Sequence, residues 1–329
     1  MRREEWQVVW QDWLRGVTLI GLCAALAGLY FSGLLSEPVF GMFLCLVATV
    51  VAGFFVVSNC MSSTSALPTR VLGTGATVAG GIVFLAGAMQ VLFPGQPAAQ
   101  AQLSFLHPQA RITVPEGAQR GCFLSVRGHP GASPSGQDSE VHATIHMRGA
   151  SGSESFSVEL FRRRQASSGG GRGRGGPSIS AREADMWYLG SPAAGDAELE
   201  LSGVKPETAL PLTLALHVPM LPPRGMAFVL WGIVLVTLIL AVPMLRQASF
   251  PAAVPFTLAL AVVNELVLRG LPPDRPALPL VGILVGGIFG GALAGYGATR
   301  LVAKLSQAEP MPRPRGRTES KGRQGHGSR

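Results

Sequence analysis

Residues 39–58 read VFGMFLCLVATVVAGFFVVS, a run of twenty residues without a charged side chain. An α-helix rises about 1.5 Å per residue, so a helix of this length crosses the ~30 Å hydrocarbon core of a bilayer. The pattern predicts a polytopic α-helical membrane protein with about six transmembrane helices. The other apolar runs lie at residues 16–35, 71–93, 226–245, 251–268 and 279–301.

The composition agrees with a membrane protein. Only 14% of the 329 residues are charged and 47% are hydrophobic, whereas soluble proteins carry about 25% charged residues. The net charge is +8, and much of it lies in a C-terminal tail and in one Gly-rich loop. Long uncharged runs alternate with polar stretches, as expected for helices joined by aqueous loops.

Between the third and fourth runs the pattern changes to alternating apolar and polar residues. Every second residue of the segment 141–147 is apolar, which is typical of a strand with one buried face. Such segments predict an inserted antiparallel β-sandwich-like domain, Ig-like in general style. The expected strands are at residues 103–107, 111–114, 122–127, 140–148, 155–161, 197–204 and 210–218.

The sequence therefore predicts five parts. They are an interfacial amphipathic segment at 1–15, helices at 16–96, an extracytoplasmic β domain at 97–224, helices at 225–304 and a disordered basic tail at 305–329. Within the β domain, residues 162–177 are rich in Gly and Arg. This segment is predicted to be a disordered loop because it has too little apolar surface to order itself.

Basic residues in the short loops predict the orientation. With the N-terminus inside, the inner segments hold most of the short-loop Arg and Lys residues, and the outer short connectors hold Arg269 and Arg275. Both termini are therefore expected to be cytoplasmic. The composition is bacterial in style, so the expected location is a bacterial inner (plasma) membrane with the β domain in the periplasm.

The last apolar run contains two ladders of small residues, a pattern typical of a glycine zipper. Each ladder recurs every four residues: Gly282, Gly286 and Gly290 in the first, and Gly287, Gly291 and Gly295 in the second. Four-residue spacing places each set along one helix face, where a neighbouring helix can approach closely. The partner is either another helix of the same chain or a helix of another subunit. A Gly286→Leu or Gly290→Leu change is expected to lower stability or assembly.

The fifth run contains a candidate intramembrane polar site. Asn264 and Glu265 lie in the apolar run, and Glu265 is four residues before Arg269. An ionisable side chain in a membrane helix is costly and favours a functional interpretation. The alternative is an i,i+4 ion pair between Glu265 and Arg269 near the membrane surface.

The first residues of the chain predict a membrane-surface helix. Trp6, Trp10 and Trp13 fall on one helical face, and charged residues occupy most of the rest. Tryptophan prefers the lipid headgroup level. The segment is therefore expected to be an interfacial anchor, with a docking face for a partner protein as the alternative.

Sequence motifs for chemistry are nearly absent. There is no fingerprint of a hydrolase, a zinc protease or a nucleotide-binding loop in a suitable context, and no cofactor or metal is predicted. His142 and His146 would stand about 13 Å apart on a strand, too far to share one metal ion. The Gly/Arg loop is either a solvated insertion or a site for anionic lipid heads or envelope polysaccharide, and its expected external position argues against nucleic acid.

These features favour a non-enzymatic membrane component that presents its β domain to a partner protein or an envelope polymer. Its partners would be membrane lipids and either other membrane or periplasmic proteins or further copies of the chain. A small transporter or channel that uses Glu265 and Asn264 is the alternative. The membrane component is favoured over the transporter because the helices carry almost no polar groups, and solute pathways usually need several. An enzyme with a site at the junction of domain and membrane is the least favoured.

Overall fold

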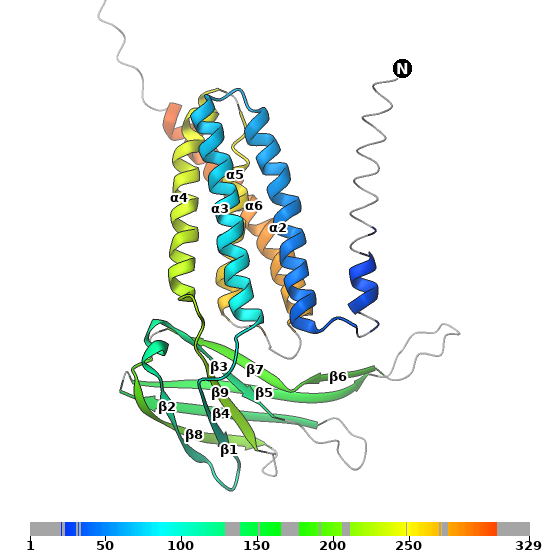
Figure 1. Cartoon of the computed structure of the whole chain (residues 1–329), viewed down its shortest axis with the longest axis vertical. Helices are drawn as coiled ribbons and strands as arrows, with labels where there is room; N and C mark the ends of the chain where they lie inside the picture. Colours follow the sequence, from blue (N-terminus) through cyan, green and yellow to red (C-terminus); the bar gives the residue numbers. More distant parts are fainter. Residues whose placement is uncertain are drawn as a thin grey trace, which may run out of the picture.

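The computed structural model describes most of the chain between residues 21 and 307. It shows a bundle of helices with two antiparallel sheets at one end (Figure 1). The described residues are 21, 24–30, 32, 34–128, 139–150, 152–165, 178–190, 192–205, 211–247, 249–269, 271 and 276–307.

Four helices of this part are long and apolar enough to cross a membrane, as expected for a membrane protein. The run at 16–35 is described only in part, with helix at residues 24–30. The count of six spans therefore stays a prediction. The four helices are α2 (Glu37–Ser62), α3 (Leu67–Leu92), α4 (Pro223–Arg246) and α6 (Ala277–Gln307).

Helix α5 (Ala253–Leu268) is shorter and lies at the centre of the bundle. Its 16 residues rise about 24 Å, and 11 of them are buried. It packs against α3, α4 and α6. Protein rather than lipid therefore surrounds most of this helix, and a reduced length costs it little.

The helices extend further than the apolar runs. The predicted runs at 39–58 and 71–93 leave residues 59–70 between them, but α2 continues to Ser62 and α3 already begins at Leu67. A proline stands at the first or second position of α3 and α4, where its missing N–H has no intrahelical partner to lose. Polar residues past the hydrocarbon core stay helical because the backbone bonds continue, so apolar runs underestimate helix length.

Glu37 joins the starts of two helices at the end of the bundle that faces the sheets. Its carboxylate accepts a hydrogen bond from the Tyr30 hydroxyl, and its Oε2 accepts one from the backbone N–H of Ala277 at 3.2 Å. That N–H lies in the first turn of α6, where backbone N–H groups have no intrahelical acceptor. Glu37 therefore caps α6 from the first residue of α2.

The two sheets have the strand orders β1-β9-β3-β7 and β2-β8-β4-β5-β6. We call them sheet A and sheet B. Their facing sides share one hydrophobic cluster, which includes Leu124 and Leu214 of sheet A and Ile145 and Leu199 of sheet B. The strands are β1 (Ala99–Leu103), β2 (Gln109–Val114), β3 (Cys122–Arg127), β4 (Ser139–Gly149), β5 (Gly152–Gln165), β6 (Ser178–Arg182), β7 (Ala184–Leu189), β8 (Gly195–Lys205) and β9 (Leu212–His217).

The described part therefore has nine strands, where the sequence pattern predicted seven. The first strand ends at Leu103 instead of beginning there, and β6 and β7 were missed. Strand β7 does not alternate because both of its faces are covered. Met186 belongs to the hydrophobic cluster of the helices, whereas Leu189 belongs to the cluster between the sheets.

Two boundaries of the predicted disordered segments are wrong. Strand β5 runs to Gln165, and Arg162 pairs with Ser139 on one side and Ala181 on the other. Residues 162–165 are therefore strand, and residues 166–177 of the Gly/Arg loop lie outside the described residues. Helix α6 likewise continues to Gln307, past the predicted start of the tail at 305, and residues 308–329 lie outside the described part.

Sheet A lies against the helices, and sheet B lies on its far side (Figure 1). Phe123 of β3 and Met186 of β7 point away from the inter-sheet core and belong to the hydrophobic cluster of the bundle. On the same face, Ser125 Oγ lies 3.0 Å from Nε2 of His217, whose Nδ1 lies 3.1 Å from the carbonyl oxygen of Gly95. The sheets are thus attached to the helices by packing as well as by the chain.

Candidate functional site

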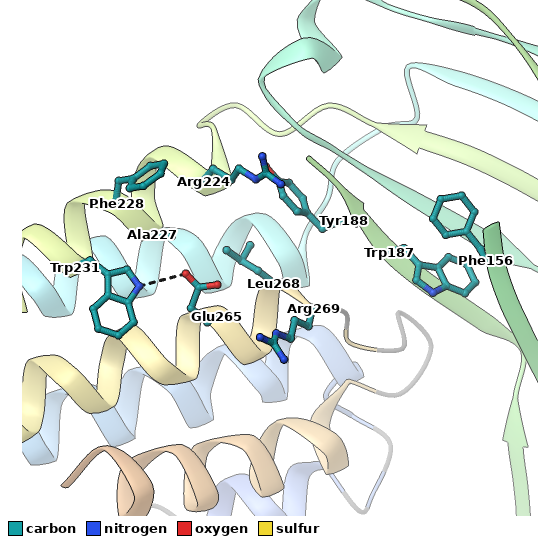
Figure 2. Close-up of a pocket in the computed structure, with 10 residues that line it drawn as sticks. All are labelled: Phe156, Trp187, Tyr188, Arg224, Ala227, Phe228, Trp231, Glu265, Leu268 and Arg269. Atoms are coloured by element: carbon teal, nitrogen blue, oxygen red, sulfur yellow. Dashed lines mark hydrogen bonds between the residues drawn. The ribbon is translucent and has the colours of Figure 1, made fainter. Parts of the chain in front are cut away.

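A pocket of about 630 Å³ opens between sheet A and the helices. Its walls come from three parts of the chain that are far apart in sequence, and Figure 2 shows their side chains. The volume falls within the range of about 300–1,000 Å³ that is usual for small-molecule sites. The lining residues are Phe156, Trp187 and Tyr188 from the sheets, Arg224, Ala227, Phe228 and Trp231 from α4, and Glu265, Leu268 and Arg269 from α5 or its end.

Helical spacing places the α4 and α5 residues on the pocket. Arg224 lies in the first turn of α4, and Trp231 follows it two turns later on the same face. Glu265 and Arg269 are one turn apart at the end of α5. Residues three, four and seven positions apart share a helix face, so the two helices each present a short polar row to the same space.

Glu265 is bonded to a tryptophan rather than to the arginine one turn away. The indole N–H of Trp231 donates to Oε1 of Glu265 at 3.3 Å (Figure 2). Within the described residues, no ion pair within 4 Å links Glu265 to Arg269, and Arg269 is exposed. A carboxylate has about four acceptor positions, so Glu265 keeps most of its capacity for a further partner.

Two glycines leave room for the side chains of Tyr188 and Arg224. The Arg224 guanidinium lies 5.9 Å from the Tyr188 ring centre. A Cβ at Gly190 would overlap that guanidinium, and a Cβ at Gly121 would overlap the Tyr188 hydroxyl. Gly121 also has a φ of 106°, a backbone conformation that residues other than glycine rarely adopt. Two positions without a side chain therefore make room for the polar ends of this wall.

The Tyr188 hydroxyl is buried and unpaired in the described structure. Burial raises the pKa of this hydroxyl, and the charge of Arg224 lowers it in part. The Arg224 backbone approaches the Tyr188 oxygen without reaching hydrogen-bond geometry, so the hydroxyl has no hydrogen-bond partner among the described residues. A buried hydroxyl without a partner costs free energy, and a polar ligand group in the pocket would remove that cost.

Asn264 does not line this pocket. Its side chain is 2% exposed and faces α3, where its Oδ1 lies against Gly87. Its Nδ2 has no hydrogen-bond partner among the described residues. Asn264 and Glu265 are adjacent in sequence, but 100° of helical turn sends them to different surroundings. The candidate polar site is thereby divided between the bundle interior and the junction.

The two glycine ladders of α6 face different surroundings. A Cβ on any glycine of the second ladder would overlap α5: Val263 for Gly287, Ala259 for Gly291 and Pro255 for Gly295. A Cβ on Gly282, Gly286 or Gly290 of the first ladder would meet no described atom of another element within 4 Å. One ladder thus lies against a helix of the same chain, and the other faces outward.

Other predicted site residues lie elsewhere. Trp6, Trp10 and Trp13 lie outside the described residues. His146 contacts the Ser155 hydroxyl at 2.8 Å and the Ser202 hydroxyl at 3.0 Å. The interfacial anchor therefore stays a prediction. His146 has two serine hydroxyls as hydrogen-bond partners.

His142 lies close to two carboxylates, one from its own strand and one from the adjacent strand. Its Nε2 lies 2.9 Å from Oε1 of Glu140, and Glu159 is its cross-strand partner on β5. The ligand-type atoms of these three residues lie within 4.8 Å of one another. Sequence spacing did not reveal this cluster, because Glu159 reaches it only through strand pairing.

Sequence reasoning found Glu265 and Arg269 but missed the other polar residues of the pocket. Tyr188 and Trp187 lie in a strand that does not alternate, and Arg224 follows a pair of prolines that marks a helix start. A single tryptophan within an apolar run, here Trp231, was the available signal, since tryptophan gathers at membrane surfaces.

The site combines aromatic walls, two guanidinium groups and one carboxylate at the end of a membrane bundle. Such a combination recognises polar or amphipathic molecules, and it contains no nucleophile beside a base among the lining residues. No protein-family model matches the sequence, and no curated protein is significantly similar to it.

Proposed function

We propose that the protein is a non-enzymatic membrane component that presents its two-sheet domain, as a β-sandwich, to a partner protein outside the cytoplasm. Six spans place both termini in the cytoplasm of a bacterial cell, and the domain stands in the periplasm. The single observation that supports this function most is that the two sheets have different surroundings. Sheet A packs on the helices, whereas the described outward-facing residues Arg111, Arg148 and Ser157 of sheet B are exposed.

The outer face of sheet B carries charges of both signs in paired rows. Arg111 of β2 lies 3.5 Å from Glu198 of β8, and Arg148 of β4 lies 3.5 Å from Glu200 of β8. Side-chain exposures of 42–77% mean that these pairs add about 0–1 kcal/mol each to stability. Charges that contribute so little to the fold are available for recognition, where complementary rows give specificity.

The helices support an anchoring role. The basic residues Arg70, Arg246, Arg300 and Lys304 all lie toward the end of the bundle opposite the sheets, in agreement with a cytoplasmic position for that end. A cavity of about 220 Å³ between α2, α3, α5 and α6 is lined by apolar side chains and Thr49. Because Asn264 and Glu265 do not share a path, transport is the less supported function.

A photo-crosslinking amino acid at Ser157 tests the proposal. Ser157 is exposed on β5 at the outer face of sheet B. In intact cells we expect a discrete crosslinked protein that disappears when Arg111→Glu and Arg148→Glu are combined. The matched control places the same crosslinker at Phe228, which faces outward on α4.

Two outcomes would contradict this function. One is a Ser157 crosslink to many proteins that the charge reversals leave unchanged. The other is a crosslink to polysaccharide with no protein, which would move the function to the envelope polymer.

A further inference from the structure

We propose that the pocket between sheet A and the helices binds the head of a phosphatidylethanolamine-type lipid, with the phosphodiester at Arg224 and Arg269 and the ammonium at Glu265. The lipid comes from the leaflet on the side of the sheets. This inference goes beyond the presenting function, because it uses the membrane embedding and not the outer face of sheet B.

The pocket lies at the level of lipid heads. Glu265 is three residues from the end of α5, which is about 5 Å of helix rise, and Trp231 is eight residues from the start of α4, or about 12 Å. Tryptophan and tyrosine gather at this depth of a bilayer, and Trp187, Tyr188 and Trp231 all line the pocket.

The pocket is reached from the lipid side. Phe228 is 75% exposed and Trp231 is 42% exposed, and both lie on α4 at the pocket (Figure 2). In a bilayer these apolar surfaces contact acyl chains. A lipid can therefore place its head in the pocket while its chains remain beside α4.

The charges of the pocket match a head with both signs. Arginine binds phosphate oxygens through several N–H groups at once, and neither Arg224 nor Arg269 has an ion-pair partner within 4 Å among the described residues. Glu265 is half-buried and receives one neutral hydrogen bond, from Trp231. An ammonium group would fill its remaining acceptor positions, and the Tyr188 hydroxyl would gain a phosphate oxygen as acceptor.

Native mass spectrometry of the full chain in detergent tests the inference. The protein is offered equal amounts of phosphatidylethanolamine, phosphatidylcholine and phosphatidylglycerol with identical acyl chains. All three carry the phosphodiester, but only the first carries an ammonium with N–H donors. We expect about tenfold preferential retention of phosphatidylethanolamine, as one charge-assisted hydrogen bond supplies.

Variants separate the two halves of the head. Glu265→Gln should abolish the preference and leave total lipid retention within about twofold, whereas Arg224→Gln with Arg269→Gln should lower retention of all three lipids about tenfold. Glu154→Gln and Arg246→Gln make the same chemical changes at residues that do not line the pocket and should change neither quantity. Size-exclusion profiles establish that each variant is folded.

Results on the unmodified protein can overturn the inference without any variant. Equal retention of the three lipids would exclude recognition of the ammonium. Displacement of the lipid by an equal concentration of water-soluble glycerophosphoethanolamine would show that the site takes a soluble phosphodiester instead. Retention that is unchanged in all pocket variants would place the lipid elsewhere.

Discussion

The indole nitrogen of Trp231 lies 3.3 Å from Oε1 of Glu265, and this bond connects α4 to α5 where both helices meet the sheets. A carboxylate in a membrane helix needs a partner, and the expected one was Arg269 on the next turn. The tryptophan takes that place and leaves the arginine to the pocket. Of the polar groups that line the pocket, the Tyr188 hydroxyl is buried without a hydrogen-bond partner among the described residues.

Replacement of Trp231 by Phe should destabilise the contact between α4 and α5. The change keeps an aromatic ring but removes the N–H donor, so we expect a loss of about 1 kcal/mol in unfolding free energy. Glu265→Gln keeps an acceptor and should cost less. Thermal unfolding in detergent provides the measurement, and a smaller loss for Trp231→Phe than for Glu265→Gln would be inconsistent with this bond.

The glycine ladders of α6 should respond differently to the same substitution. Gly291→Ala places a methyl group in steric overlap with the backbone of Ala259, and such overpacking costs about 1–3 kcal/mol. Gly290→Ala is the matched control, because its Cβ meets open space. We expect a lower unfolding temperature for Gly291→Ala alone, and equal effects would argue against the observed packing of α6 on α5.

Gly290→Leu addresses contacts beyond the single described chain. Since a Cβ at Gly290 would meet open space, a leucine there is expected to act on an association with something outside the described chain. A smaller particle on detergent chromatography with unchanged thermal stability would indicate a second copy on this face. Unchanged particle size would leave lipid as the neighbour.

The stability of the sheets should fall in mild acid because of His217. Burial lowers the pKa of this histidine, the positive Arg127 lowers it further, and the Gly95 carbonyl partly opposes both. The folded imidazole therefore stays neutral below the unfolded pKa of about 6.5. As the pH falls below that value, the imidazole is protonated in the unfolded state but not in the folded state. The free energy of unfolding therefore decreases until the pH reaches the pKa of the folded state.

A comparison with His217→Gln isolates this effect. The wild-type chain should lose up to about 1.4 kcal/mol per pH unit within the window, and the variant should lose less between pH 6.5 and 5. Thermal unfolding at a series of pH values measures both. Parallel pH profiles for the two proteins would assign the acid sensitivity to other groups.

Cysteine labelling should report the orientation, but Cys122 is a poor reporter. It is 0% exposed, and burial together with the nearby Glu154 raises the pKa of its thiol to about 12. We expect it to react with a maleimide only after unfolding. Ser157→Cys on sheet B and Lys304→Cys near the end of α6 are exposed alternatives.

In intact cells a membrane-impermeant maleimide should label Ser157→Cys at once and Lys304→Cys only after permeabilisation. This order follows from the proposed placement of the sheets outside and the C-terminus inside. The reverse order would invert the topology and leave the fold unchanged.

Several helices were predictable because their signal is local. The runs around α2, α3, α4 and α6 are long and uncharged, and burial in lipid requires nothing more of a sequence. The hairpin of β4 and β5 was also predictable, since alternation and a short Gly-rich turn are local features. Strand β7 was not, because Met186 and Leu189 serve two different cores and the alternation disappears.

By itself, the sequence determined the membrane character and the inserted β domain, and it identified Glu265 as a candidate site residue. The tertiary structure decided that Trp231 and not Arg269 would bond to Glu265, that Asn264 would turn away from it, and that Arg224 and Tyr188 would share its pocket. The physical reason is range. Hydrophobicity acts on each residue and its near neighbours, whereas a site between three elements depends on where the folded chain brings side chains as distant in sequence as Tyr188 and Glu265.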